Sequence, residues 1–364
     1  YRFGTNSQKL QRGLPNAYID IMKAIGIMLV VLGHTYHNSR FIYLFHMPLF
    51  FILSGATLIY SKHKYNIRKR FNGIIIPYLI FSFLSFLYWF ILESKFRPVN
   101  DVPIFIGSLG TLPVKLQQFI NIFTAENASN SFTYNVVLWF LPCLFIADII
   151  YSRIKDKKLE ILYLIGLIII YYLWIEKLPC LLWCSNLAIL AVPLIALGYH
   201  SYKHTLYFLT SGKSILKNII FLIILICSIG IIIKLQNPTI NMMANTIPPF
   251  YLFYPLAIIG CLMVLSLSLI IIQLFKQIKF IKNIQYIGEN SLIIMCIHEP
   301  IKRIVLMLIS KISHIPTDII RDNLAFSLGI TMIIIFICIP FIYIIRNYLP
   351  WMIGKNISLL SNKK

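Results

Sequence analysis

The chain has 364 residues, of which 59% are hydrophobic and 12% charged, and its formal net charge is +21. Soluble domains have about 45–50% apolar and about 25% charged residues, so this composition excludes a soluble fold, a disordered chain and a small disulfide-stapled domain. One membrane-spanning helix takes about 20 apolar residues, and the chain has material for roughly ten. We therefore predict an all-α integral membrane protein.

The basic charge by itself could indicate nucleic-acid binding. That function needs Lys and Arg clustered on a soluble face or motif, whereas here they fall in short runs between apolar stretches. Such runs are typical of the cytoplasmic loops of membrane proteins. We expect no nucleic-acid partner, and note that positive charge also suits a phosphorylated cosubstrate or an anionic lipid surface.

Ten apolar stretches predict membrane-spanning helices. They cover residues 21–37, 42–60, 71–93, 134–151, 159–175, 182–199, 216–234, 250–273, 290–309 and 324–345. Lys and Arg concentrate in the N-terminal segment, in alternate loops and in the tail, which predicts that both termini are cytoplasmic. The expected organisation is a cytoplasmic segment 1–17 without a signal peptide, a ten-helix domain 18–346 and a cytoplasmic tail 347–364.

The first stretch carries a histidine deep along its length. If the helix enters the membrane between Asp20 and Lys23, His34 lies about 16–21 Å along it, at or past the middle of a hydrocarbon layer of about 30 Å. Ionisable groups at that depth are costly and therefore candidates for function. A neutral imidazole there can take a proton from an attacking hydroxyl, and the structural alternative is a hydrogen bond to a neighbouring helix.

The second stretch begins at His46, which could close a hydrated pocket with His34 and His37. A metal site made of histidines alone is conceivable, but no carboxylate completes it, and we expect no metal. The run Arg68, Lys69 and Arg70 follows this stretch. Its cations could hold phosphate groups, although the topology rule alone also explains a basic cytoplasmic run.

Residues 94–133 form the longest predicted external loop, which carries several Gln and Asn side chains together with Asp101 and Glu126. A loop of this length is often functional, and it lies on the side where an external substrate would arrive. The alternative is a simple connector.

The ninth stretch carries a second deep histidine, His298, about 15 Å from Gly288 along a helix. Glu299 beside it could orient a catalytic base, or it could form a purely structural ion pair with Lys302 or Arg303. Pro300 predicts a kink, and a kink at membrane depth usually faces protein or a cavity.

Several of these residues belong to an ordered set of motifs. The set comprises Asp20-x-x-Lys23, Gly33-His34, Phe45-His46-Met47-Pro48-Leu49-Phe50-Phe51, Ser54-Gly55, Ile76-Pro77-Tyr78, Leu138-Trp139-Phe140-Leu141-Pro142, Gly288-x-Asn290-Ser291 and His298-x-Pro300. With these motifs the chain resembles the membrane acyltransferase-3 family, in particular its fucose 4-O-acetylase-like branch, from the first predicted span to the ninth.

The resemblance implies ten spans, a cytosolic acyl-CoA donor (usually acetyl-CoA) and a sugar hydroxyl of a cell-surface polysaccharide or glycolipid as acceptor. The richness in Ile, Lys and Asn is compatible with an AT-rich bacterial genome, so we expect the membrane to be a bacterial cytoplasmic membrane. The resemblance also makes His34 the leading catalytic candidate, with His298 and Glu299 supporting it. The substrate-binding candidates are His46, Trp139 and Asn290.

For donor binding, the resemblance implies a pair of arginines after the second span. Arg70 matches the first, but Gly73 stands at the second, so donor binding is expected to fall to Arg70 with Arg68 or Lys69. Direct transfer and an acyl-enzyme relay both stay open. A transporter or flippase of a glycan or lipid-linked sugar is the competing class, because many spans, a polar centre and broken helices suit it too.

Overall fold

The computed structural model describes residues 5–60, 65–95, 113–125, 134–177, 181–210, 214–275 and 278–355. These residues are helical almost throughout, apart from loops and one isolated bridge between Asn241 and Thr246. The predicted all-α class is therefore confirmed. Of the predicted external loop, residues 96–112 and 126–133 lie outside the described residues, as do Lys62, Lys64, Lys213 and Lys276 of the basic loops and the tail from residue 356.

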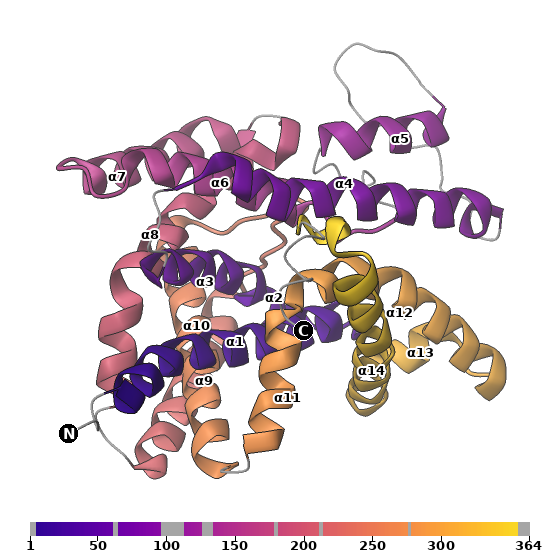
Figure 1. Ribbon diagram of the computed structural model, residues 1–364. Coiled ribbons are helices and arrows are strands. Elements are labelled where there is room, and N and C mark those ends of the chain that lie inside the picture. The colour runs from indigo at the N-terminus through magenta and orange to yellow at the C-terminus, as the bar shows by residue number, and fades with distance from the viewer. Residues whose placement is uncertain are drawn as a thin grey trace.

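The α-helices follow one another as labelled in Figure 1. Their bounds are α1 Thr5–Thr35, α2 Arg40–Tyr43, α3 His46–Tyr60, α4 Ile67–Ile91, α5 Val114–Thr124, α6 Phe140–Ile154, α7 Glu160–Leu173, α8 Ser185–Thr210, α9 Ile215–Gln236, α10 Phe250–Leu274, α11 Ile278–Glu289, α12 Ser291–Ser313, α13 Thr317–Asp322 and α14 Leu324–Tyr348. Short 3₁₀ turns follow at Glu93–Lys95, Ile175–Lys177, Leu182–Cys184 and Pro350–Ile353.

Seven helical segments of the described chain are long and apolar enough to cross a membrane. They are Ala17–Thr35, Arg40–Leu58, Ile67–Lys95, Leu182–Thr205, Ile215–Gln236, Phe250–Leu274 and Leu324–Tyr348. The other three predicted spans correspond to α6, α7 and α12. The first two have only 15 and 14 residues, and α12 carries three charged residues within one turn, Glu299, Lys302 and Arg303.

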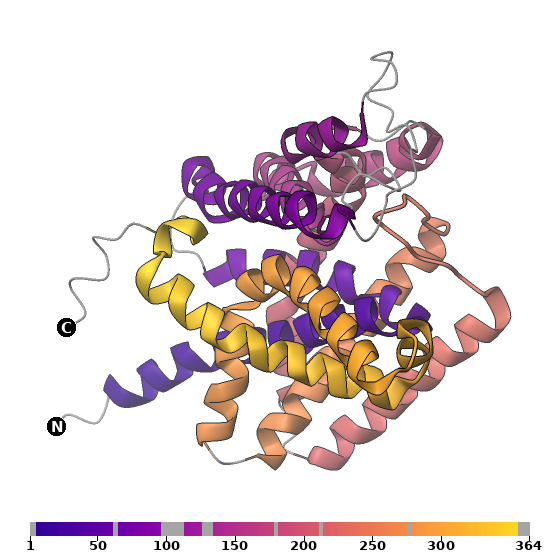
Figure 2. The same ribbon diagram turned by 90° about the vertical axis from the view of Figure 1, so that its right-hand side faces the viewer.

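Helix α1 lies at the centre of one half of the molecule. It packs against α3, α10, α11, α12 and α14. Figure 2 shows the purple and magenta helices of residues 65–177 as a layer above this group. Because neighbours surround α1, the side chains at its C-terminal end lie inside the protein.

Glycines allow two pairs of helices to approach unusually closely. A Cβ atom at Gly55 of α3 would lie 1.9 Å from the Ile195 carbonyl oxygen of α8, and one at Gly198 of α8 would lie 1.9 Å from the Ile52 oxygen. Small residues at such crossings are typical of helices packed within membranes. At Gly288, a Cβ would lie 1.7 Å from the Asp20 oxygen, which ties α11 to α1.

The outer surface exposes large apolar side chains on several helices. Ile161 of α7 and Phe336 of α14 are 74% and 73% exposed, and Ile223 and Ile224 of α9 are each 54% exposed. Soluble monomers rarely expose contiguous apolar surface of this kind. The surface therefore fits contact with lipid.

Candidate active site

His34 lies in the last turn of helix α1, which ends at Thr35. Carbonyl groups at a helix C-terminus lack partners within the helix and attract cations. Here Arg321 of α13 donates to the Thr35 and His34 oxygens at 3.1 and 3.2 Å, and Lys302 Nζ of α12 donates to the His34 oxygen at 3.2 Å. Two cations from other helices thus hold the backbone that carries the His34 imidazole.

The structure brings His34, His46 and His298 together. The ring centroids of His34 and His298 are 5.9 Å apart. The ring of Tyr43 contacts both other histidines, with its centroid 6.2 Å from that of His34 and 4.9 Å from that of His46. His46 and His298 are buried, while His34 is partly exposed. The predicted pocket of His34, His46 and His37 is divided between two cavities: His46 shares one with His34 and His37 shares the other, while His298 lines neither.

Hydrogen bonds fix the proton on two of the three imidazoles. Nδ1 of His298 lies 2.8 Å from the Ile294 oxygen, and Nδ1 of His46 lies 2.9 Å from the Ile42 oxygen. A carbonyl oxygen can only accept, so each Nδ1 carries a proton and each neutral ring keeps its lone pair on Nε2. Nε2 of His298 is buried with no hydrogen-bond partner in the described chain.

The His34 imidazole itself makes no hydrogen bond with another described residue; its neighbours are the rings of Tyr43 and His298. The structural alternative, a histidine tied to an adjacent helix, is therefore not what the described residues show. Both ring nitrogens are free to meet a substrate.

Glu299 is engaged in ion pairs. Its carboxylate accepts hydrogen bonds from Lys302 Nζ at 2.8 Å and from Arg303 Nε at 3.3 Å, and Arg303 also pairs with Glu93 at 2.7 Å. These groups are largely buried, so their charges must balance one another. Glu299 neutralises cations next to His34, and none of its hydrogen bonds goes to an imidazole of the described chain.

His34 lines two cavities. The smaller, of about 130 Å³, is also lined by His46, Trp139 and Met242. The larger, of about 450 Å³, is lined by Arg40, Lys302 and Arg321 among others. The loop between α9 and α10 contributes Asn241 to both. Two of the predicted substrate-binding residues, His46 and Trp139, thus share a cavity with His34.

The third such residue, Asn290, lies elsewhere. It precedes α12, donates to the Tyr286 oxygen at 2.6 Å and accepts from Arg346 at 3.3 Å. His298 is eight residues further on, about 12 Å along the helix, and neither cavity at His34 includes Asn290 among its lining residues. Its contacts join α11, α12 and α14.

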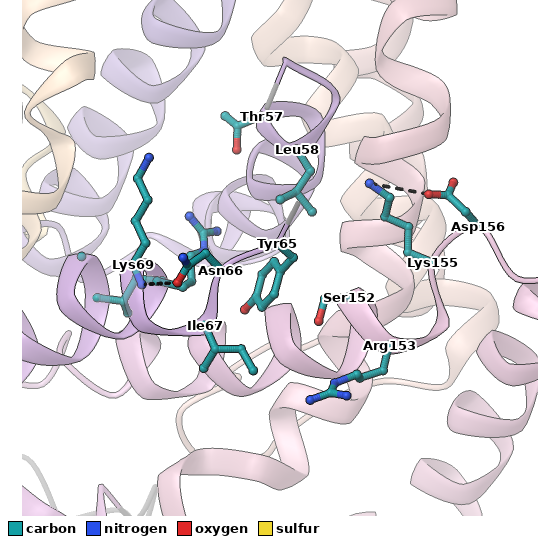
Figure 3. A pocket seen from close by; sticks show the side chains of 13 residues that line it. Thr57, Leu58, Tyr65, Asn66, Ile67, Lys69, Ser152, Arg153, Lys155 and Asp156 are labelled. Carbon is teal, nitrogen blue, oxygen red and sulfur yellow. Dashed lines mark hydrogen bonds and ion pairs between the residues drawn. The ribbon is translucent and has the colours of Figure 1, made fainter. Parts of the chain in front are cut away.

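A third cavity, of about 1010 Å³, lies between α3, α4 and α6 (Figure 3). It is lined by the predicted donor-binding residues Lys69 and Arg70, and by Gly73. Arg68 is exposed and is not part of its wall. From α6 and the turn after it come Arg153 and Lys155, which the sequence assigned to topology alone, together with Ser152 and Asp156.

Arg70 is held by a buried carboxylate that the sequence analysis missed. Its Nε donates to Asp148 Oδ2 at 2.7 Å, its second terminal nitrogen forms an ion pair with the same carboxylate, and it donates to Ser54 Oγ at 2.7 Å. Ser54 in turn donates to Asp148 Oδ1 at 3.0 Å. Asp148 is an acid within an apolar stretch, the same signal that singled out His34 and His298.

The Arg70 cavity and the two cavities at His34 share no lining residue. Helix α3 connects them, because His46 lines one and Ser54, eight residues later and about 12 Å along the helix, contacts Arg70. Packed rings lie in between, with Phe51 and Phe50 at 4.9 and 6.0 Å from Phe140.

Residues 16–345 match a family model described as an acyltransferase domain. The chain belongs to the acyltransferase-3 family. It is therefore a membrane acyltransferase. The family and the enzyme class predicted from the sequence motifs are confirmed, and the match identifies no particular branch of the family. Comparison with curated proteins and with solved structures gives no significant match to this acyltransferase.

The arrangement suits proton transfer within a membrane acyltransferase. A neutral imidazole can act as a general base because its ordinary pKa is close to working pH. Within the described part of the chain, no three His, Cys, Asp or Glu side chains come together as a metal site would require. What the geometry offers is an unpartnered imidazole, a second neutral imidazole beside it and two cations at the backbone below it.

Proposed function

We propose that this acyltransferase transfers an acetyl group from cytosolic acetyl-CoA to a hydroxyl of a sugar in a cell-surface polysaccharide or glycolipid, as in the fucose 4-O-acetylase-like branch. The observation that supports this most strongly is the position of His34. Its imidazole has no hydrogen-bond partner among the described residues, lines two cavities and lies beside the buried His298.

The proposed setting is a bacterial inner membrane, with ten spans and both termini in the cytoplasm. The basic segments support it, because Arg68, Lys69 and Arg70 begin α4 and Arg153 ends α6, and positive loops stay in the cytoplasm. The Arg70 cavity then opens to the cytosol, where acyl-CoA is found. Helix α1 runs from the cytoplasmic side and carries His34 toward the opposite side, where the sugar arrives.

In the proposed reaction, the donor phosphates bind in the Arg70 cavity and the acyl-pantetheine arm extends along α3 toward His34. This path requires the packed rings of Phe50, Phe51 and Phe140 to open. A ring nitrogen of His34 takes the proton of the sugar hydroxyl while its oxygen attacks the thioester carbonyl. The new C–O ester bond forms and the C–S bond breaks. The departing CoA thiolate then takes the proton from the His34 imidazolium. Lys302 and Arg321 hold the His34 backbone in place.

A two-step relay uses the same groups, with the acetyl first on an enzyme nucleophile. Incubation with labelled acetyl-CoA in the absence of sugar separates the two routes: a relay leaves the label on the protein, and direct transfer does not. In both routes the sugar is the final acceptor.

The function is tested with purified full-length chain, radiolabelled acetyl-CoA and a panel of bacterial surface glycans. The wild type should label a glycan, and His34→Gln should lower the rate by about 10²–10⁴-fold, the usual contribution of a general base. The matched control is His204→Gln, which removes an exposed imidazole of α8 outside all three cavities. Wild-type transfer by a correctly inserted His34→Gln variant would exclude His34 as the base, and a wild type that moves glycan without acetylating it would favour the transporter.

A further inference from the structure

The Arg70 cavity has the size and charge of a site for a nucleotide-like ligand. Its volume of about 1010 Å³ is at the upper end of the range for ligand pockets, about 300–1,000 Å³. Four cations line it, Lys69, Arg70, Arg153 and Lys155, against one carboxylate, Asp156. A cation that already forms an ion pair within the protein is less able to bind a phosphate, so the partners of the four decide which of them a ligand can use.

Two of the four cations are already paired. Arg70 is bound to Asp148, whose side chain is fully buried, and removing the cation would leave an uncompensated charge inside the protein. Lys155 lies 3.7 Å from Asp156 and stands over the Tyr199 ring at 4.2 Å from its centroid. Both cations have a structural task that explains their presence.

The other two cations have no such partner. The side chains of Lys69 and Arg153 make no hydrogen bond or ion pair with any residue that the structure describes. They are exposed, and they approach the cavity from different elements, Lys69 from the first turn of α4 and Arg153 from the last turn of α6. In Figure 3 the Arg153 guanidinium extends toward the side of the cavity where Tyr65 and Ile67 lie.

One further polar group in this cavity lacks a partner. The Tyr65 hydroxyl is buried and makes no hydrogen bond within the described chain. Buried polar groups are nearly always satisfied, so an exception calls for an explanation. A phosphate oxygen would accept a hydrogen bond from this hydroxyl.

We propose that Lys69 and Arg153, one from each side of the cavity, form the phosphate-binding site for the acyl-CoA donor. Arg70 is then a positioning residue that joins α4 to α6 through Asp148. Arginine binds phosphate through two parallel N–H donors and lysine through a compact charge. The assignment rests on the proposed function, because it takes acyl-CoA as the donor.

The position of Gly73 provides a way to test the site by gain of function. Gly73 lines the same cavity, one turn after Arg70, and a Cβ atom built there meets nothing within 4 Å. A Cβ atom is therefore accommodated without moving its neighbours, and the cavity leaves room for the rest of a side chain. Gly73→Arg adds a guanidinium to the α4 wall and should compensate for the loss of Arg153.

The experiment measures binding of CoA to the purified full-length chain. Arg153→Gln and Lys69→Gln should each weaken CoA binding about tenfold or more, the usual loss when a charged hydrogen bond is removed. Lys158→Gln is the matched control, since it removes an exposed cation of the segment after α6 that does not line the cavity, and its affinity should stay within about twofold of wild type. Gly73→Arg in the Arg153→Gln background should restore most of the lost affinity.

Dephospho-CoA, which lacks the 3′-phosphate, adds a second readout. If Arg153 contacts that phosphate, wild type discriminates between the two ligands and Arg153→Gln does not; if Arg153 contacts the diphosphate, the variant weakens both ligands equally. Either result supports the site.

Unchanged CoA affinity in Arg153→Gln and Lys69→Gln, or an equal loss in Lys158→Gln, would overturn the assignment. In that case a wild type that still binds CoA and acetylates glycan leaves the proposed function standing. A wild type that neither binds CoA nor transfers label would overturn the proposed function as well. Because both substituted side chains are exposed, thermal unfolding of the variants should match wild type.

Discussion

The His298 ring lies beside the His34 ring, with one nitrogen hydrogen-bonded to backbone and the other without a partner in the described chain. Nδ1 is bound to the Ile294 carbonyl, while the buried Nε2 has no partner in the described chain, and the two ring centroids are 5.9 Å apart. The lone pair on this Nε2 is shielded from water near the proposed base, so it can accept a hydrogen bond from the N–H of a protonated His34 or from the sugar hydroxyl. His298 is thus suited to support His34 rather than to replace it.

This relationship predicts a non-additive pair of substitutions. His298→Ala should lower the acetylation rate about tenfold to a hundredfold, because the hydrogen bond that Nε2 is proposed to accept from the protonated base or the sugar hydroxyl during the reaction cannot form, while the base remains. When two residues act as one catalytic unit, removing the second costs little further rate once the first is gone. The double variant His34→Ala/His298→Ala should therefore be no slower than His34→Ala.

The measurement is the rate of label transfer by each variant at equal amounts of inserted protein. If the losses of the two single variants multiply in the double variant, His298 acts independently of His34, and the supporting role is wrong.

The close crossing of α3 and α8 leads to a prediction about stability. Gly198→Ala places a methyl group 1.9 Å from the Ile52 carbonyl oxygen, so the two backbones must separate. Forcing extra volume into packed interiors costs about 1–3 kcal/mol and occasionally more. We expect the midpoint of thermal unfolding in detergent to fall clearly.

The matched control is Gly230→Ala on α9, where an added Cβ meets nothing within 4 Å. Alanine is favoured over glycine in a helix by about 1 kcal/mol, so this variant should be neutral or slightly stabilised. Similar unfolding midpoints for the two variants would contradict the close packing of α3 and α8.

Much of the fold follows from the sequence because apolar length is a local signal. Stretches such as 250–273 and 324–345 coincide closely with α10 and α14. Helix α12 shows the limit of that signal. Its Glu299, Lys302 and Arg303 neutralise one another and Glu93 inside the protein, and that compensation depends on packing.

The candidate site divides in the same way. The cost of burying an imidazole singled out His34 and His298. For Glu299 the sequence left two alternatives open, orienting a base or pairing with Lys302 or Arg303, and the structure shows both ion pairs. The partner of Arg70 was missed because Asp148 is 78 residues away in the chain. Pairing across that separation depends on how α4 packs against α6, which periodicity and composition do not encode.

The last prediction concerns Arg40, which attaches the loop between α9 and α10 to the His34 cavities. Its Nε and one terminal nitrogen donate to the Pro238 oxygen at 2.9 and 2.6 Å, and its other terminal nitrogen bonds the Asn237 side chain. The same loop supplies Asn241 to the walls of both cavities. Arg40→Ala should loosen the loop and raise the KM for the sugar about tenfold, since up to three hydrogen bonds of about 1 kcal/mol each are lost.

The donor site lies elsewhere, so the KM for acetyl-CoA should not change in Arg40→Ala. Lys234→Ala is the control, because it removes an exposed cation from the last turn of α9, just before the same loop, without touching Pro238. Steady-state rates measured against each substrate separate the two constants. Equal changes in both constants would point to a general loss of structure, and an unchanged sugar KM would show that the loop does not shape the acceptor site.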